Sequence, residues 1–239
     1  MLKAVFFDLD GTLLPMDEKV FTEGYFRFLV KKVSPCGYEP KKLIDTIWKG
    51  TYLMVKNDGR KSNEEVFWDC FSSVYGENSL KDKSFFDEFY LNEFREAKSF
   101  CKENPLAKEI VSSVKKKGLK CILSTNPFFP REGQKTRISF IGLKEDDFDY
   151  ITDYSNSSFC KPNPKYFASL LEKFRLKPEE VILFGNNTLE DGDCARAVGI
   201  KTYLVKGYII HNEKAEGIYP EIEMKDVTEI IEKEIRERM

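Results

Sequence analysis

The sequence is poor in histidine, since His211 is the only one among 239 residues. A site that needs several imidazoles is therefore excluded, and we expect carboxylates to carry any acid–base chemistry. The sequence also lacks an apolar run long enough to cross a bilayer. Charge arrives within the first few residues, which does not fit a signal peptide. We therefore expect a soluble, cytoplasmic protein with no membrane partner.

A charge excess and paired cysteines are also missing. Lys and Arg total 38 against 40 Asp and Glu, a formal net charge of -2, which gives no reason to expect a nucleic-acid partner. The six cysteines are scattered and include no CxxC pair, so we interpret them as reduced thiols rather than as a zinc or disulfide framework. Aromatic residues make up 14% of the chain, which is enough for a packed core.

What is present is an alternation of short apolar runs and helical patterns. Buried strands are predicted at 3–8, 120–125, 181–185 and 201–205, with a weaker candidate at 148–152. Helices are predicted between them and over 221–239. This order is typical of a parallel sheet in an α/β fold. Residues 15–101 break the alternation, because four segments there carry apolar residues at helical spacing. We therefore predict an inserted helical module.

Two aspartates, Asp8 and Asp10, follow the first predicted strand in the stretch VFFDLDGTLL. Alternation along a strand puts both side chains on one side, with Leu9 pointing away. Carboxylates this close repel each other unless a cation joins them or one is protonated, and Mg²⁺ with oxygen ligands would resolve this. A calcium loop is disfavoured because Lys19 stands where the twelfth-position Glu is needed. A plain solvated turn remains the alternative.

The other strand ends also carry polar groups, and in an open parallel sheet such ends meet at one edge. A hydroxyl, an amide and backbone N–H groups after one strand are suited to phosphate oxygens, and a lysine before a helix is suited to offsetting carboxylate charge. Taken singly, each of these groups is also compatible with a helix cap, a surface lysine or a turn. The residues concerned are Thr125, Asn126, Lys161, Asn186, Asn187 and Asp191.

These residues resemble the haloacid dehalogenase-like (HAD) hydrolase superfamily. All four family motifs occur in order, as DLDGT at 8–12, STN at 124–126, Lys161 in CKPNP, and GNNTLED at 185–191. The resemblance spans the whole chain, and the first motif is its most specific part. It implies a Rossmann-like α/β core formed by 1–15 and 101–239, with an all-helical type-1 cap at 16–100 over the active site.

The resemblance also implies roles. Asp8 is expected to be the nucleophile that forms an aspartyl-phosphate, while Asp10 protonates the leaving group and then activates water. Lys161 is expected to balance charge between Asp8 and the phosphoryl group. The phosphoryl oxygens are assigned to Thr125 and to a set drawn from the first two motifs: Leu9, Gly11, Thr12 and Asn126.

Magnesium is implied as the cofactor, held by Asp8, the main-chain carbonyl of Asp10 and a side chain of the fourth motif. The family usually has an acid directly after the motif-four glycine or one place later, but here both positions are amides, Asn186 and Asn187. An amide oxygen binds magnesium without adding charge. We therefore expect weaker affinity or help from Asp191, and spacing does not choose among the three.

The cap is expected to select the substrate. In the polar loop 56–63, Asn57 and Arg60 are candidate substrate-binding residues, with a plain exposed turn as the alternative. The aromatic residues of NPFFP, at 126–130, either line the cleft or pack in the core. Asp10 argues against dehalogenase chemistry, because dehalogenases of the family typically lack this second aspartate.

The predicted function is a magnesium-dependent phosphatase that acts on a small phosphorylated metabolite, as a monomer or small homo-oligomer. A phosphomutase of the same family is the first alternative. The alternative from another class is a phosphate- or metal-binding protein without turnover, suggested by the amides Asn186 and Asn187.

Overall fold

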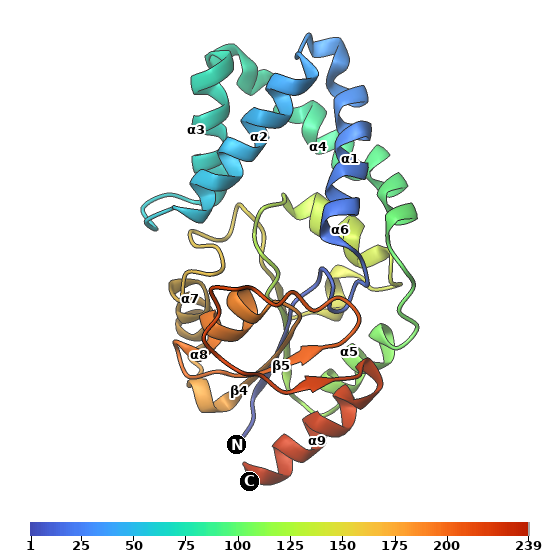
Figure 1. The fold of residues 1–239 in the computed structure, drawn as a ribbon, viewed down its shortest axis with the longest axis vertical. Coiled ribbons are helices and arrows are strands. Elements are labelled where there is room, and N and C mark those ends of the chain that lie inside the picture. The colour runs from blue at the N-terminus through green and yellow to red at the C-terminus, as the bar shows by residue number, and fades with distance from the viewer. Residues whose placement is uncertain (239) are drawn as a thin grey trace.

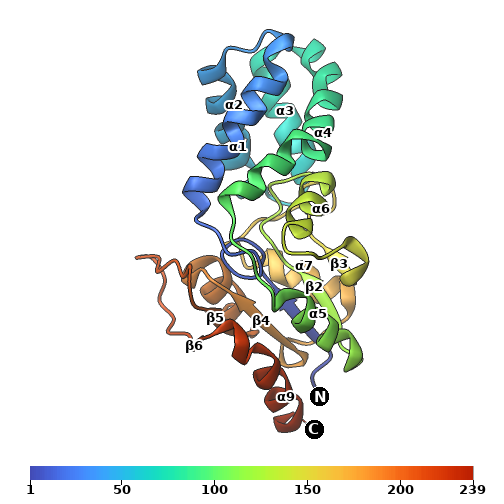
Figure 2. The ribbon, with the colours of Figure 1, turned by 90° about the vertical axis from the view of Figure 1, so that its right-hand side faces the viewer.

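Six parallel strands form the sheet at the base of the molecule in the computed structural model, which describes residues 1–238 (Figures 1 and 2). Their order across the sheet is β3-β2-β1-β4-β5-β6, and all neighbouring strands pair in parallel. The strands are β1 (Ala4–Phe7), β2 (Lys120–Leu123), β3 (Tyr150–Ile151), β4 (Val181–Gly185), β5 (Lys201–Val205) and β6 (Glu221–Ile222). The predicted α/β, Rossmann-like fold is confirmed.

Helices cover both faces of this sheet. The first face packs on α5 (Ala107–Lys116) and α9 (Val227–Glu237), and the second on α7 (Lys165–Phe174) and the short α8 (Cys194–Arg196). Alternation explains the division, because Val5 and Phe7 belong to the first core and Phe6 to the second. All four residues of β1 are fully buried, as expected for a central parallel strand.

The stretch 16–100, called here the helical insertion, contains no strand of the sheet in the described chain. It holds α1 (Glu18–Val33), α2 (Pro40–Val55), α3 (Asn63–Tyr75) and α4 (Lys83–Leu91), followed by 3-10 turns at Glu93–Phe100. These helices stand at the carboxyl-terminal edge of the sheet, on the same side as α6 (Arg131–Ser139) (Figures 1 and 2). Their contacts are largely aromatic: Trp68, Phe71 and Phe86 pack edge to face, with ring centroids 5.2–5.5 Å apart.

Two connections tie the insertion to the sheet. Its entry and exit segments run side by side, and the N–H of Lys102 donates to the carbonyl of Pro15 at 2.8 Å. On the far side, the start of α3 docks on the loop before α7, where the N–H of Asn63 donates to the carbonyl of Ser157 at 2.8 Å. The side chain of Asn63 is buried and donates to Cys160 Sγ at 3.3 Å.

The C-terminal part differs from the sequence prediction. A helix is predicted over 221–239, but Glu221–Ile222 forms the edge strand β6 and the helix begins at Val227. Between β4 and β5, where the sequence predicts a helix, the chain forms a π-helical turn, Thr188–Asp193, followed by the short α8. Among the residues that the structure describes, none of the helices has the length and apolar character needed to cross a membrane.

Candidate active site

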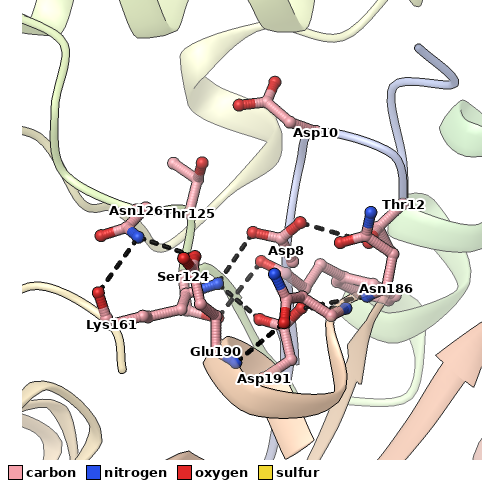
Figure 3. A network of polar contacts seen from close by, with 12 residues as sticks. Asp8, Asp10, Thr12, Ser124, Thr125, Asn126, Lys161, Asn186, Glu190 and Asp191 are labelled. Atoms are coloured by element: carbon pink, nitrogen blue, oxygen red, sulfur yellow. Dashed lines mark hydrogen bonds and ion pairs between the residues drawn. The ribbon is translucent and has the colours of Figure 1, made fainter. Parts of the chain in front are cut away.

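The strand register brings the motif residues together. Phe7 at the end of β1 lies opposite Leu123 of β2 and Phe184 of β4. The residues that follow these three positions therefore lie side by side at the same edge of the sheet. The N–H of Asp8 donates to the carbonyl of Phe184 at 2.8 Å, and that of Ser124 donates to Phe7 at 2.7 Å. The carboxyl ends of the central strands therefore form the floor of one site (Figure 3).

Lys161 lies at the centre of this site. Its Nζ donates to Asp8 Oδ1 at 2.8 Å and to Asp191 Oδ1 at 2.6 Å, and all three side chains are buried (Figure 3). The other oxygen of Asp8 accepts from Thr12 Oγ1 at 3.2 Å. One buried cation thus holds two carboxylates that would otherwise repel each other.

Asp191 organises the fourth motif. Its Oδ2 accepts the backbone N–H groups of Asn186 and Asn187, each at 3.0 Å. The Asn187 side chain caps the π-helical turn, accepting from the N–H groups of Leu189 and Glu190 at 3.0 and 3.1 Å. Hydrogen bonds thus engage both oxygens of Asp191 and the side-chain oxygen of Asn187.

The side chain of Asn186 has a different setting. Its Nδ2 donates to the carbonyl of Tyr208 at 2.8 Å, and this places the amide against the backbone of Gly11. Gly11 has φ +73°, and a Cβ there would collide with the Asn186 amide, so the position requires glycine on both counts. The Asn186 amide therefore lies directly against the turn that carries the two aspartates.

Asp10 belongs to a second ion pair. Its carboxylate points away from Asp8 in Figure 3 and pairs through Oδ2 with Arg137 Nη1, while the other Asp10 oxygen is buried without a partner. The Arg137 side chain is fully buried in α6, with its guanidinium carbon 4.2 Å from the centre of the Phe129 ring. Gln134, one turn earlier, accepts from Arg137 Nη2 and donates to the carbonyl of Thr152 at 3.0 Å.

The electrostatics of the site follow from burial and from an excess of acids. Burial raises the pKa of Asp8 to about 7, with Asp191 and Asp10 adding to the effect and Lys161 opposing it. Burial also works against the charge of Lys161, but Asp191 and Asp8 outweigh it and hold the Lys161 pKa well above its ordinary value. Burial likewise raises the pKa of Glu190, which accepts from Asn126 Nδ2 at 2.8 Å. The site therefore favours an added positive charge.

A pocket of about 170 Å³ opens above Asp8 and Lys161, here called the catalytic pocket. Thr125 and Asn126, at the end of β2, line it, and Asn126 Oδ1 is buried without a partner. Most of the predicted site residues line this pocket together: Asp8, Asp10, Thr125, Asn126, Lys161, Asn186, Asn187 and Asp191. Leu9, Gly11 and Thr12 form the turn beneath it, where the carbonyl of Leu9 accepts the N–H of Thr12 at 3.1 Å.

The two substrate-binding residues predicted in the helical insertion lie away from the catalytic pocket. Arg60 is exposed and pairs with Asp58, its Nη2 lying 2.6 Å from Asp58 Oδ2. The Asn57 side chain instead holds the 56–63 loop, donating to the Lys61 carbonyl and to Asn63 Oδ1, both at 2.9 Å. The sequence of the 56–63 loop shows only that it is polar. It does not show that the loop packs against the core loop before α7.

The catalytic pocket also contains residues that the sequence motifs did not identify. Glu18, Thr22, Trp48 and Thr51 reach it from the helical insertion, and Phe128 and Phe129 from the loop after β2. Both aromatic residues of NPFFP therefore contribute to the lining, and Phe129 also packs on Phe94 at 5.7 Å. No sequence motif singled out Arg137.

The donor set is compatible with a hard cation but does not form an all-carboxylate cage. Within residues 1–238, no three Asp, Glu, His or Cys side chains converge on a preformed metal site. Oxygens of Asp8, of the Asp10 backbone and of the Asn186 amide are nevertheless the type of ligand that Mg²⁺ takes, together with waters. The raised pKa of Asp8, which a nearby cation would offset, fits this assignment.

Comparisons with known proteins identify the family of the chain. A family model described as haloacid dehalogenase-like hydrolase matches residues 2–199. The phosphorylated carbohydrates phosphatase of Thermotoga maritima is 22% identical over 200 residues, covering 84% of this chain and 83% of that protein. The chain spans less than half the length of several other curated relatives that it matches.

Solved structures extend the comparison to the whole fold. A HAD phosphatase from Thermococcus onnurineus is 19% identical with a TM-score of 0.56, covering 96% of this chain and 98% of that one. A 2-haloacid dehalogenase from Pseudomonas syringae pv. Tomato DC3000 is 17% identical with a TM-score of 0.60, covering 98% and 99%. At these identities the two structures show the fold alone. With the family model matching most of its length, the chain belongs to the haloacid dehalogenase-like hydrolase family.

Proposed function

We propose that the protein is a magnesium-dependent phosphatase that hydrolyses a small phosphate monoester through an aspartyl-phosphate on Asp8. The observation that carries this proposal is the buried Lys161, whose Nζ bridges Asp8 and Asp191 at the floor of the catalytic pocket. A lysine so placed neutralises the nucleophile while a phosphate dianion approaches it. Thr125, Asn126 and the backbone at Leu9, Gly11 and Thr12 bind the phosphoryl oxygens.

In the first step, an oxygen of Asp8 attacks phosphorus and the bond from phosphorus to the leaving oxygen breaks. Asp10 gives its proton to that oxygen, so the product leaves as a neutral alcohol. In the second step, water attacks the aspartyl-phosphate, Asp10 accepts the water proton, and the bond between phosphorus and Asp8 breaks. Inorganic phosphate is released and both aspartates return to their starting states.

Arg137 is the positioning residue for Asp10 in this scheme. Its charge and its stacking on Phe129 fix one orientation of the Asp10 carboxylate, above Asp8 on the side of the helical insertion. Gln134 holds the guanidinium in turn. The Asp10 carboxylate therefore stays at the place where the leaving oxygen and later the attacking water are expected.

Asp8, the backbone carbonyl of Asp10 and the Asn186 amide are the residues that would hold Mg²⁺. When bound, the ion supplies charge neutralisation between Asp8 and the phosphoryl oxygens. Asn187 and Asp191 support this set indirectly, because their side chains accept hydrogen bonds from the motif-four backbone and, for Asp191, from Lys161. We therefore choose Asn186 from the three candidate magnesium ligands of the fourth motif, among which sequence spacing did not decide.

The helical insertion, residues 16–100, acts as the cap in this proposal, and 1–15 with 101–239 form the core. The position of the catalytic pocket supports this assignment of the cap, because Trp48 and Thr51 of α2 line the pocket together with the core aspartates. The paired linkers at Pro15 and Lys102 are the points where this cap would hinge.

The test is phosphate release from 4-nitrophenyl phosphate and from a panel of alkyl and sugar phosphates, with Mg²⁺ and with a chelator. The proposal predicts magnesium-dependent release by the wild type and none by Asp8→Asn. Isomerised sugar phosphate without free phosphate would instead identify a phosphomutase. Binding of phosphate or its analogues without any turnover would identify a binding protein and refute the enzyme.

A further inference from the structure

The catalytic pocket has room for one anionic group. Lys161 is the one basic residue among the described residues that line it, and both Asp8 and Asp191 already engage its ammonium. The helical insertion contributes Thr22, Trp48, Thr51 and an acid, Glu18, to the lining. A carboxylate or a second phosphate on the substrate would therefore meet acids and an indole rather than a free cation.

A larger cleft of about 1130 Å³ continues from this pocket, here called the side cleft. It lies between α1 and α2 of the helical insertion and the segment 208–210 after β5. Residues shared by the two linings show that the two spaces adjoin: Met16, Glu18, Thr22, Trp48 and Asn186. The side cleft is thus the neighbouring space toward which a group joined to a phosphate in the catalytic pocket can extend.

The walls of the side cleft are largely apolar. They include Phe26 and Ile44 of the helical insertion, facing Ile209 and Ile210 of the core segment. The charged residues of the lining are Lys19 and Arg27 against three acids, Asp17, Glu18 and Glu23. Burial raises the pKa of Glu18 to about 8, so the two cations are balanced by the two remaining acids near neutral pH. The lining therefore offers a second anion no net attraction.

Trp48 stands where the two spaces meet. Its indole packs edge-on against Phe26 at 5.7 Å, yet 52% of the residue is exposed. A half-exposed tryptophan beside a catalytic pocket presents a large apolar face that a ligand can cover.

Resting on the proposed function, we propose that the substrate is a phosphate monoester whose phosphoryl group is its only anion. Its alcohol part is apolar and extends past Trp48 into the side cleft. Phosphorylated carboxylic acids and bisphosphates are expected to be poor substrates. The basic residue of the catalytic pocket, Lys161, is already engaged by two carboxylates, and the two cations of the side-cleft lining, Lys19 and Arg27, are balanced by acids of the same lining.

The test compares three esters with similar leaving groups: ethyl phosphate, 3-phenylpropyl phosphate and 3-(4-carboxyphenyl)propyl phosphate. We expect kcat/KM for the phenylpropyl ester to exceed that for ethyl phosphate by about tenfold or more. The carboxylated ester, of nearly equal size, should lose most of this gain. Phosphate release is measured with Mg²⁺ for each ester.

Variants assign the effect to the residues named. Trp48→Ala should bring the phenylpropyl ester close to ethyl phosphate, whereas Tyr52→Ala should leave the preference unchanged. Tyr52 is the matched control, because it lies on the same helix, is 60% exposed and lines neither space. Thr22→Lys, which adds a cation to both linings, should raise kcat/KM for the carboxylated ester selectively.

The failures of the two proposals are distinguishable. If no ester releases phosphate, the proposed function is refuted and the substrate assignment falls with it. If ethyl phosphate or the carboxylated ester is hydrolysed as efficiently as the phenylpropyl ester, the phosphatase stands and the substrate assignment is overturned. The substrate assignment is also overturned if Trp48→Ala keeps the full preference for the phenylpropyl ester over ethyl phosphate.

Discussion

Replacing Arg137 by methionine should impair the protonation of the leaving group more than any other step. The change keeps an unbranched apolar stem in α6 and removes the guanidinium that pairs with Asp10 and stacks on Phe129 at 4.2 Å. The Asp10 carboxylate then loses the partner that fixes its orientation, while Asp8 and Lys161 keep their own contacts. The loss should therefore fall on the chemistry that Asp10 performs.

The size of the effect can be estimated from the contacts. A positioned general acid is worth about 10²- to 10⁴-fold in rate, so kcat/KM for an alkyl phosphate should fall by about 10²-fold or more. Breaking a buried ion pair costs about 3–5 kcal/mol of stability, and the lower end applies because the Asp10 side chain keeps 20% of its surface exposed. Arg137→Lys keeps the charge but not the planar guanidinium. Its kcat/KM for the alkyl phosphate should therefore lie between the values for the wild type and Arg137→Met.

The assay compares an alkyl phosphate with 4-nitrophenyl phosphate. The nitrophenolate leaves without needing a proton. In Arg137→Met, kcat/KM for 4-nitrophenyl phosphate should therefore fall much less than kcat/KM for the alkyl phosphate. The control is Arg131→Met, on the same helix, because the Arg131 side chain is 60% exposed and pairs with Glu145 away from the catalytic pocket. Equal losses for both substrates, or no loss for either, would refute the role assigned to Arg137.

Three further predictions follow from the contacts. Asn186→Asp should tighten Mg²⁺ binding by about tenfold or more because it adds a charge to the ligand set, while Asn187→Asp should leave it unchanged; titration calorimetry measures both, and the reverse order would contradict the ligand assignment. Lys161→Met should lower the free energy of unfolding by about 3–5 kcal/mol because Asp8 and Asp191 lose their buried cation, and an unchanged urea midpoint would contradict that argument. Asn63→Ala should lower the free energy of unfolding by about 1–3 kcal/mol, because the buried side chain of Asn57 loses its hydrogen bond to Asn63. A thermal unfolding curve like that of the wild type would contradict this.

The fold and the floor of the site could be predicted because they depend on local patterns. Continuous apolar runs such as AVFF at Ala4–Phe7 indicate central parallel strands, and their carboxyl ends must meet at one edge. Asp8, Thr125 and Lys161 could therefore be placed together before the structure was known. The edge strand Glu221–Ile222 could not, because two paired residues are too short to show a period.

The residues that escaped prediction depend on tertiary packing. Arg137 is joined to Asp10 across 127 positions of the chain, and only tertiary packing brings α6 next to the turn that follows β1. Asn57 and Arg60 lie in a loop whose position is set by the contact of α3 with Ser157 and Cys160. Neither arrangement leaves a periodic or motif signal in the sequence.

Acid quenching of a single turnover, followed by peptide mapping by mass spectrometry, shows directly whether Asp8 is the nucleophile. We expect the wild type, given Mg²⁺ and an aryl phosphate, to carry one phosphoryl group on the peptide that contains Asp8, and Asp8→Asn to carry none. Phosphate release without any phosphorylated peptide, or a phosphoryl group on another residue, would contradict Asp8 as the nucleophile.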